Sequence, residues 1–378
     1  MNHLGDAVRQ VGVGVRRRSA GARLVAGLAR RDRDFALALG YFGFGNLGDE
    51  ALADLFRARS ELDVAASDFP RWLTALLAAR PQRFGNVRQI VLFGGTLIGR
   101  WPWSGRLREL HRLFPEASMW GLGVGVEDPA ELAAADAGAW RREVDQLLDL
   151  APKMAVLSVR GPRSRQVLAA AGLDLPWAGD PALLLGPTQP PAPAEERSVL
   201  VTVGAVDRVD GASRRHLAEL LQQSVSSLVQ AGWQATVMPV HPIDRAEVRA
   251  LAAHVGSAGL RVAPVTTSWR RFQEAASRHR VGLHVRLHPS VLSAATFAPH
   301  VQLSYLTKCD DFADTIGARP LAVAGLRPGA VVEAVEEAAQ HWDSRRRELV
   351  EAVGAARARL ELHFAGAADA LAARSVPK

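Results

Sequence analysis

The segment from residue 281 to residue 317 carries the pattern that decides the fold: VGLHVRLHPSVLSAATFAPHVQLSYLTKCDDFADTIG. It opens with an apolar run, continues through an Ala-rich stretch predicted to be a helix, and reaches Lys308 after a second apolar run predicted to be a strand. Arg286 and His288 stand at the start of the predicted helix. Two cations and an imidazole are therefore expected at one strand-end region. Such a set is suited to a small acidic substrate, in particular a phosphorylated one.

The same alternation of strands and helices extends over most of the 378-residue chain. Apolar runs that end in glycine-rich or cationic turns recur through residues 35–186 and again through residues 199–325. This rhythm predicts an α/β protein with two Rossmann-like domains, each built on a doubly wound parallel sheet. The proline-rich segment 187–198, PTQPPAPAEERS, is expected to link them, and residues 326–378 are expected to form C-terminal helices that pack over the domains.

Charge is distributed unevenly along the chain. Residues 1–34 hold eight Arg and three Asp, so this arm carries +5 of the total net charge of +7. The arm is either a solvated extension or a contact to an anionic membrane surface or nucleic acid. No segment reaches the roughly 18 apolar residues of a membrane span, and no basic, aromatic-rich face for nucleic acid is evident outside the arm. We expect a cytoplasmic protein, at the inner face of the membrane if the arm binds lipid.

Cysteine and histidine usage argues against a metal centre. Cys309 is the only cysteine, which excludes intramolecular disulfides and cysteine-based metal clusters. His284 and His288 would share a face if both were helical, but no Glu lies between them and no third ligand is evident. We therefore expect no metal centre; no resident cofactor is expected either.

Glycine-rich turns follow two of the predicted strands in the first domain. Residues 35–42 form an apolar strand that runs into GFGNLGDEALADLFRAR, where Asn46 and Asp49 are suitable N-cap residues for the helix behind them. Strand, glycine loop and helix make up an anion-binding layout, although the same pattern also occurs in turns that only pack tightly. A second glycine turn follows the strand at 89–93. The binding candidates at these turns are Gly45, Asn46, Gly48, Gly94, Gly95 and Thr96.

Further polar residues stand at other predicted strand ends. Arg160 ends one strand, where its guanidinium could fork onto a carboxylate or phosphate. Arg163 stands at the start of the next helix, where a cation opposes the helix dipole, which hints at use in binding. Asp180 marks the following turn, and His241 opens the loop HPID of the second domain. Each is a candidate for the substrate site.

Eight motifs follow one another along the chain: GYFGFGNLGDEAL (40–52), FGGTLIG (93–99), GLGVGV (121–126), VRGPRS (159–164), GDPALLL (179–185), MPVHPIDRAEV (238–248), RLH (286–288) and SYLTK (304–308). Taken in this order, they resemble the polysaccharide pyruvyl transferase family across roughly residues 38–318. Three places depart from the family pattern: Phe93 replaces a glycine, Leu306 replaces an aspartate, and residues 298–300 read Ala-Pro-His.

The resemblance implies a GT-B-like fold, with two Rossmann-like domains facing a cleft. It implies transfer of the pyruvyl group of phosphoenolpyruvate onto two hydroxyls of one sugar in a polysaccharide or glycolipid precursor, forming a cyclic ketal and releasing phosphate. Phosphoenolpyruvate would then be a co-substrate, and the acceptor could be lipid- or nucleotide-linked. The resemblance also implies that Arg160, Arg286 and His288 line the donor site.

Roles for the remaining residues follow from the chemistry of this reaction. Two guanidinium groups, with Lys308 as a third contact, could hold the carboxylate and phosphate of the donor. His288 could protonate the enol methylene. The sugar hydroxyl needs a base, for which Asp49, Asp180 and Asp244 are candidates and Asp49 is preferred.

Two other functions fit parts of the pattern. One is a GT-B glycosyltransferase, because glycine turns and cationic strand ends also suit the diphosphate of a nucleotide sugar. The other is a non-catalytic protein that binds anionic glycans or lipids.

Overall fold

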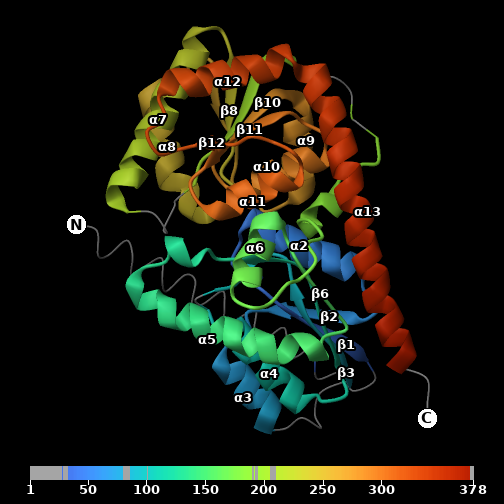
Figure 1. The fold of residues 1–378 in the computed structure, drawn as a ribbon. Coiled ribbons are helices and arrows are strands. Elements are labelled where there is room, and N and C mark those ends of the chain that lie inside the picture. Colours follow the sequence, from blue (N-terminus) through green and yellow to red (C-terminus); the bar gives the residue numbers. More distant parts are fainter. Residues whose placement is uncertain are drawn as a thin grey trace. The chain divides into compact units, whose positions relative to one another are not determined.

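The computed structural model describes residues 28, 33–79, 86–99, 101–189, 191, 195–204 and 210–374 (Figure 1). The predicted basic arm therefore lies almost entirely outside the described residues. The chain forms two compact units. Unit 1 contains the chain up to Arg160, Ser164–Pro181 and the chain from Leu360 onward; unit 2 contains Gly161–Arg163 and Ala182–Arg359.

Unit 1 contains a six-stranded parallel sheet in the order β2-β1-β3-β5-β4, with β6 paired to β5. Because β2 lies on one side of β1 and β3 on the other, the direction of winding reverses between β1 and β3. In order, the elements are β1 (Asp34–Leu39), α2 (Leu47–Arg59), β2 (Asp63–Ser67), α3 (Arg71–Ala79), β3 (Asn86–Phe93), β4 (Thr96–Ile98), α4 (Trp103–Leu113), β5 (Ser118–Val126), η2 (Pro129–Glu131), α5 (Ala134–Leu150), η3 (Ala151–Lys153), β6 (Val156–Val159), α6 (Pro162–Ala170) and η4 (Pro181–Leu185).

The sequence of β5 shows why this sheet forms. All nine of its residues, SMWGLGVGV, are buried. A strand of a parallel sheet is covered by helices on both faces, so it needs a continuous apolar run rather than an alternating one. The apolar residues of β1 and β3 join the same core with those of α4 and α5.

Unit 2 contains a second parallel sheet, in the order β12-β11-β10-β7-β8-β9. Here the winding reverses between β7 and β10. The elements are β7 (Glu195–Thr202), α7 (Gly211–Gln230), β8 (Gln234–Val237), η5 (Pro242–Asp244), α8 (Arg245–Val255), β9 (Leu260–Val262), α9 (Trp269–Arg278), β10 (His279–His284), α10 (Leu287–Ala295), β11 (His300–Ser304), α11 (Thr307–Thr315), β12 (Leu321–Ala322) and α12 (Pro328–Gln340).

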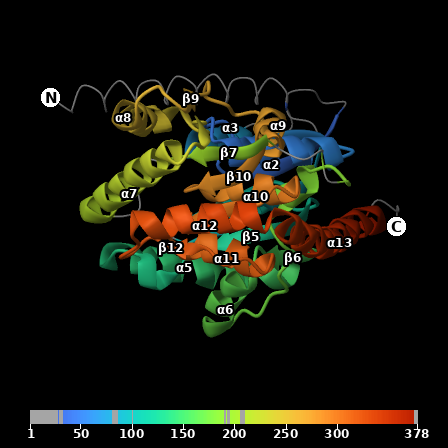
Figure 2. The ribbon, with the colours of Figure 1, turned by 90° about the horizontal axis from the view of Figure 1, so that it is seen from above.

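Helices cover both faces of this second sheet. Figure 1 shows α7 and α8 to one side of it and α9 and α10 to the other. The helix α12 lies beside α7 and against β10 and β11 (Figure 2). The segment 281–317 lies in β10, α10, β11 and α11, and it confirms the helix predicted for the Ala-rich stretch and the strand predicted before Lys308. The predicted α/β class with two doubly wound parallel sheets is confirmed.

The last helix, α13 (Trp342–Arg374), continues from one unit into the other. Within unit 2, the ring of Trp342 lies against the guanidinium of Arg280, 4.7 Å from the ring centroid. Within unit 1, the ring of Phe364 packs against Phe93 and Trp120 at centroid distances of 5.8 and 6.0 Å. No helix among the described residues is both long and apolar enough to cross a membrane.

The unit boundaries differ in detail from those expected. The chain passes from unit 1 to unit 2 after Pro181, five residues before the expected boundary at 186. The expected linker 187–198 overlaps β7, because Glu195 already pairs with His279 of β10. Backbone pairing extends β7 toward the amino terminus of its apolar residues. The polar residues at the start of the strand therefore resemble a linker in the sequence.

Candidate active site

The reversal point of the unit 2 sheet is where Arg286 lies. Arg286 follows β10, and Gly204 follows β7, the neighbouring strand. A Cβ built on Gly204 would lie 3.1 Å from Cγ of Arg286, so the glycine leaves room for the arginine side chain. In doubly wound α/β sheets, the carboxyl ends of the strands at such a reversal form the usual ligand site.

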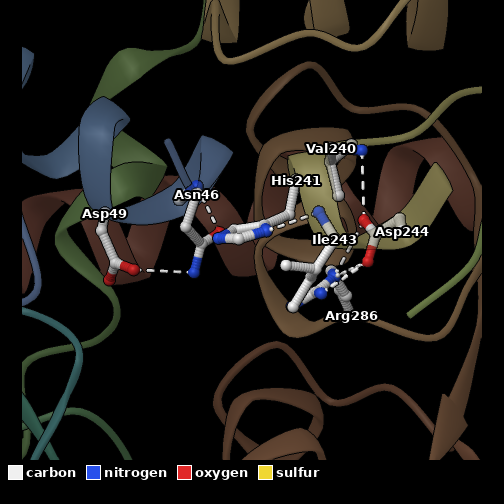
Figure 3. Close-up of polar contacts among 8 residues, drawn as sticks. Asn46, Asp49, Val240, His241, Ile243, Asp244 and Arg286 are labelled. Carbon is white, nitrogen blue, oxygen red and sulfur yellow. Dashed lines mark hydrogen bonds and ion pairs between the residues drawn. The ribbon is translucent and has the colours of Figure 1, made fainter. Parts of the chain in front are cut away.

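Asp244 fixes the orientation of Arg286 (Figure 3). Nε of Arg286 donates to both carboxylate oxygens at 3.1 Å, and Nη2 donates to Oδ1 at 2.5 Å. Asp244 is completely buried, and 17% of the Arg286 side chain is exposed. The backbone N–H of Val240 donates to Oδ2 of Asp244 at 3.3 Å. A buried carboxylate needs such partners, and this forked pair in turn restricts the guanidinium.

His288 and Lys308 stand at equivalent places on adjacent strand–helix units. His288 is the second residue of α10, after β10, and Lys308 is the second residue of α11, after β11. Both residues are partly exposed, although the Nε2 atom of His288 is buried. The Nζ of Lys308 lies 5.1 Å from the centroid of the Tyr305 ring. Because β10 and β11 are neighbours in register, their carboxyl ends bring Arg286, His288 and Lys308 to one edge of the sheet.

His241 lies in the loop after β8, on the other side of β7. Its Nδ1 accepts a hydrogen bond from the N–H of Ile243 at 3.1 Å and caps η5 (Figure 3). With Nδ1 as the acceptor, a neutral His241 carries its proton on Nε2. The same loop supplies Asp244, so His241 and the Arg286 pair belong to the same edge.

Arg163 is held by acidic residues of α11. Its Nε donates to Asp314 at 2.7 Å and its Nη1 donates to Asp310 at 3.3 Å. The hydrogen bond that Arg163 donates to Asp314 and the neighbouring acidic charges raise the pKa of Arg163. Its backbone N–H also donates to Asp311, at 2.9 Å. These carboxylates provide a structural reason for a cation at the start of α6, in addition to the substrate contact expected there.

In unit 1, the glycine loop that precedes α2 binds the side chain of Glu50, a residue of α2 itself. Gly43 and Gly45 adopt φ angles of +85° and +76°, which favour glycine. Their N–H groups donate to one oxygen, Oε1 of Glu50, at 2.9 and 3.0 Å. The sequence prediction did not identify Glu50. Its position in the first turn of α2, directly after a glycine-rich loop, was the available signal.

Asn46 and Asp49 form a cap at the start of α2. Oδ1 of Asn46 accepts from the N–H of Gly48 at 3.3 Å, and Nδ2 of Asn46 donates to Oδ2 of Asp49 at 2.7 Å (Figure 3). Asp49 is 8% exposed. The spacing of an N-cap residue and an acid three positions later is that of a capping box.

The second glycine turn lies beside this cap. Gly94 and Gly95 have φ angles of +58° and +66°, and a Cβ on Gly95 would lie 4.0 Å from Oδ1 of Asp49. A Cβ on Gly94 would lie 2.6 Å from the Leu52 side chain. Because these turns follow β3 and β1, Asp49 lies at the point where the unit 1 sheet reverses direction.

Arg160 and Asp180 are buried parts of unit 1. Arg160 follows β6, is 0% exposed, and donates from Nη1 to Oγ1 of Thr96 at 3.5 Å. Its guanidinium occupies space that a Cβ on Gly125 would enter, at 2.7 Å. Asp180 is also 0% exposed. The predicted donor residues are thus divided: Arg160 belongs to unit 1, whereas Arg286 and His288 belong to unit 2.

His284 has a different environment from His288. It ends β10 rather than lying on the helix, so the two imidazoles do not share a helix face. Its Nδ1 lies 3.2 Å from Oγ1 of Thr202 and its Nε2 lies 2.9 Å from Oγ of Ser293. Burial, together with the neighbouring His300, lowers the pKa of His284 well below its ordinary value. His284 is therefore a neutral core residue.

Comparison with solved structures shows the fold type. HepE of Anabaena in complex with UDP-glucose matches with a TM-score of 0.54 and 9% identity, over 90% of this chain and 100% of that chain. A putative UDP-N-acetylglucosamine 2-epimerase from Listeria monocytogenes matches with a TM-score of 0.50 and 8% identity, over 85% and 91% of the two chains. A mutant of S. aureus TarM, in complex with fondaparinux, α-GlcNAc-glycerol and UDP, has a TM-score of 0.48 and 11% identity over 69% of this chain. The chain spans 54%, or about half, of TarM.

The likenesses to HepE and to the putative epimerase show a GT-B-type fold, as predicted, and at such identities they show the fold alone. No curated protein sequence matches the chain. The sequence does match the family model described as polysaccharide pyruvyl transferase, over residues 46–307. That range begins at the cap formed by Asn46 and ends at the start of α11, so it includes the reversal points of both sheets. The chain belongs to the polysaccharide pyruvyl transferase family.

Proposed function

We propose that this protein transfers the pyruvyl group of phosphoenolpyruvate to two hydroxyls of one sugar, forming a cyclic ketal and releasing phosphate. One observation carries the proposal. At the reversal point of the unit 2 sheet, a buried carboxylate orients Arg286, and the same edge carries His288 and Lys308. This arrangement supplies fixed positive charge for an acidic donor and a titratable proton source beside it.

Phosphoenolpyruvate presents a carboxylate and a phosphate, so its binding needs more than one cation. Arg286 is the primary contact in this proposal, because its side chain is already oriented and remains 17% exposed. Lys308 provides a second, more flexible charge. Arg160, whose side chain is completely buried in unit 1, is proposed as a further donor contact on the basis of the family motif alone. No cofactor takes part.

His288 is proposed as the general acid. Its proton moves to the methylene carbon of the donor, which becomes a methyl group and leaves C2 electrophilic. A sugar hydroxyl forms the first C–O bond at C2. The bond between C2 and the phosphate oxygen then breaks, and a second hydroxyl of the same sugar forms the second C–O bond at C2. Two hydroxyl protons are released overall: one replaces the proton given to carbon, and the other leaves with phosphate.

Asp49 is the favoured general base among the three candidates. Asp244 is occupied by Arg286, and Asp180 is completely buried. Asp49 retains slight exposure and lies at the glycine turn that carries Gly95. The hydrogen bond from Asn46 orients one of its oxygens. We propose that the turns at Gly48, Gly94 and Gly95 bind the acceptor around this carboxylate.

The acceptor is proposed to be a sugar of an exopolysaccharide or cell-envelope glycolipid precursor, carried on a lipid or a nucleotide. The proposed location is the cytoplasm, at the inner face of the membrane. The charge of residues 1–34 supports a peripheral contact with anionic lipid.

The second candidate function is a glycosyltransferase that uses a nucleotide sugar. The specific observation that favours it is the likeness to HepE, whose structure contains UDP-glucose. It predicts binding of a nucleotide sugar and indifference to phosphoenolpyruvate.

Calorimetric titration with phosphoenolpyruvate and, separately, with UDP-glucose tests the proposal without an acceptor. Arg286→Ala should weaken phosphoenolpyruvate binding by about 2–5 kcal/mol. Arg278→Ala is the matched control, because that arginine is exposed on α9 and pairs with Glu274. Arg286→Ala also removes the partner of buried Asp244, so Lys308→Ala provides a second variant that leaves the ion pair intact.

His288→Ala separates binding from chemistry. It should keep phosphoenolpyruvate binding and lose acceptor-dependent phosphate release. Binding of UDP-glucose without phosphoenolpyruvate would favour the glycosyltransferase. If neither phosphoenolpyruvate nor UDP-glucose binds, the result contradicts the proposed donor site.

A further inference from the structure

Glu50 has a role in the glycine loop that the family motif does not reveal. One oxygen of its carboxylate accepts from two backbone N–H groups, those of Gly43 and Gly45. The N–H groups converge because both glycines adopt positive φ angles on either side of Phe44. Such alternation forms a concave arrangement of amides that suits an anion. Here the anion is supplied by the chain itself.

The same loop leads directly into the cap that carries Asp49. The backbone N–H of Glu50 donates to the carbonyl of Asn46 at 3.0 Å, while the Glu50 side chain reaches back to Gly45. Asn46 is thus held on its amino-terminal side by the fixed loop and on its carboxyl side by the first turn of α2. From this position its Nδ2 donates to Asp49 at 2.7 Å.

A loop with two positive-φ glycines has little intrinsic preference for one conformation, because glycine has the largest backbone freedom of any residue. Without an acceptor for the two N–H groups, the loop would exchange among several conformations and move Asn46 with it. Hydrogen bonds to an ionised carboxylate are stronger than neutral ones, so Glu50 is an effective restraint.

We propose that Glu50 is a positioning residue: its carboxylate holds the 43–46 loop in the conformation in which Asn46 orients Asp49. The inference rests on the proposed function through the role of Asp49 as the general base. Because the backbone N–H groups of Gly43 and Gly45 already donate to Glu50, the anionic part of the acceptor binds at groups other than these two amides.

Three variants on one helix test the proposal. Glu50→Ala removes the acceptor, and Glu50→Gln retains a side-chain carbonyl that can accept both N–H groups. Asp54→Ala is the matched control, because Asp54 is an exposed acid on α2 that pairs with Arg57 of the same helix. Amide hydrogen exchange of each full-length variant is followed in the segment 40–52. Steady-state kinetics of phosphate release are measured on the same variants.

Glu50→Ala should speed exchange at Gly43 and Gly45 and lower kcat by about 100-fold, the cost of a small misplacement of a reacting group. KM for phosphoenolpyruvate should change by less than about threefold, since the donor contacts lie elsewhere. Glu50→Gln should restore part of the exchange protection and part of kcat, because its neutral carbonyl accepts the same two bonds more weakly than the carboxylate does. Asp54→Ala should match the wild type in both measurements.

Wild-type exchange and kcat in Glu50→Ala would overturn the proposal. So would equal losses in Glu50→Gln and Glu50→Ala, because the carbonyl of Gln can still accept both bonds. If the wild type releases no phosphate with any acceptor, the proposed function fails by itself. Amide exchange then still decides whether Glu50 holds the loop.

Discussion

Replacing Glu143 by Gln should stabilise the protein at high pH and leave its stability nearly unchanged at low pH. Glu143 lies on α5 and is 2% exposed, and its Oε1 accepts from the N–H of Ser104 at 2.6 Å at the start of α4. Burial raises the pKa of Glu143 from 4.5 to about 7, although hydrogen bonds from Ser104 and Trp103 and the charge of Arg106 oppose the rise.

The magnitude follows from that shift in pKa. At about 1.4 kcal/mol per pKa unit, the change from 4.5 to about 7 corresponds to about 3 kcal/mol. The folded state holds this proton more tightly than the unfolded state. Its contribution to stability is therefore present in full below pH 4.5 and is lost as the pH rises through about 7. Gln keeps an acceptor for Ser104 and carries no charge to bury.

Urea denaturation of the wild type and Glu143→Gln, compared between about pH 5 and about pH 8.5, measures the effect, because other titrations cancel in the difference. The variant should gain up to about 3 kcal/mol across this range, with most of the gain below pH 8. Asp145→Asn, at an exposed position of the same helix, is the control. A difference between wild type and Glu143→Gln that stays flat with pH would refute the reasoning.

Three further predictions concern other parts of the fold. Asp244→Ala should destabilise unit 2 by about 3–5 kcal/mol in denaturant titrations, because it deprives Arg286 of a buried carboxylate; an unchanged midpoint would contradict this. Burial lowers the pKa of His284 and lowers that of His300 to about 4, so the stability they contribute is present above pH 6.5 and lost below it. Thermal melts of His300→Gln should accordingly show less acid sensitivity than the wild type. Glu361→Ala should cost less than about 1 kcal/mol, since its ion pair with α2 is exposed, and a loss that persists in high salt would argue against a screened pair.

Local pattern in the sequence was sufficient for the architecture around the site. The apolar runs of β5 and β10 are followed by glycine or cationic turns, and such runs suit strands that are covered on both faces of a parallel sheet. Because parallel strands place their carboxyl ends at one edge, the positions of Arg286, His288 and Lys308 followed from the order of strands and helices. The same reasoning placed Asp49 beside the glycine turns.

Only the tertiary structure decided which side chains bind each other. Asp244 and Arg286 are 42 residues apart, and Arg163 pairs with Asp314 across 151 residues. The role of Glu50 was not predicted for a different reason. A carboxylate in the first turn of a helix is ordinarily explained by its favourable interaction with the helix dipole. Its hydrogen bonds to the loop depend on the φ angles of two glycines. Periodicity reports which face of an element is buried, whereas these pairings depend on where separate elements meet, and that is determined by the packing of the whole unit.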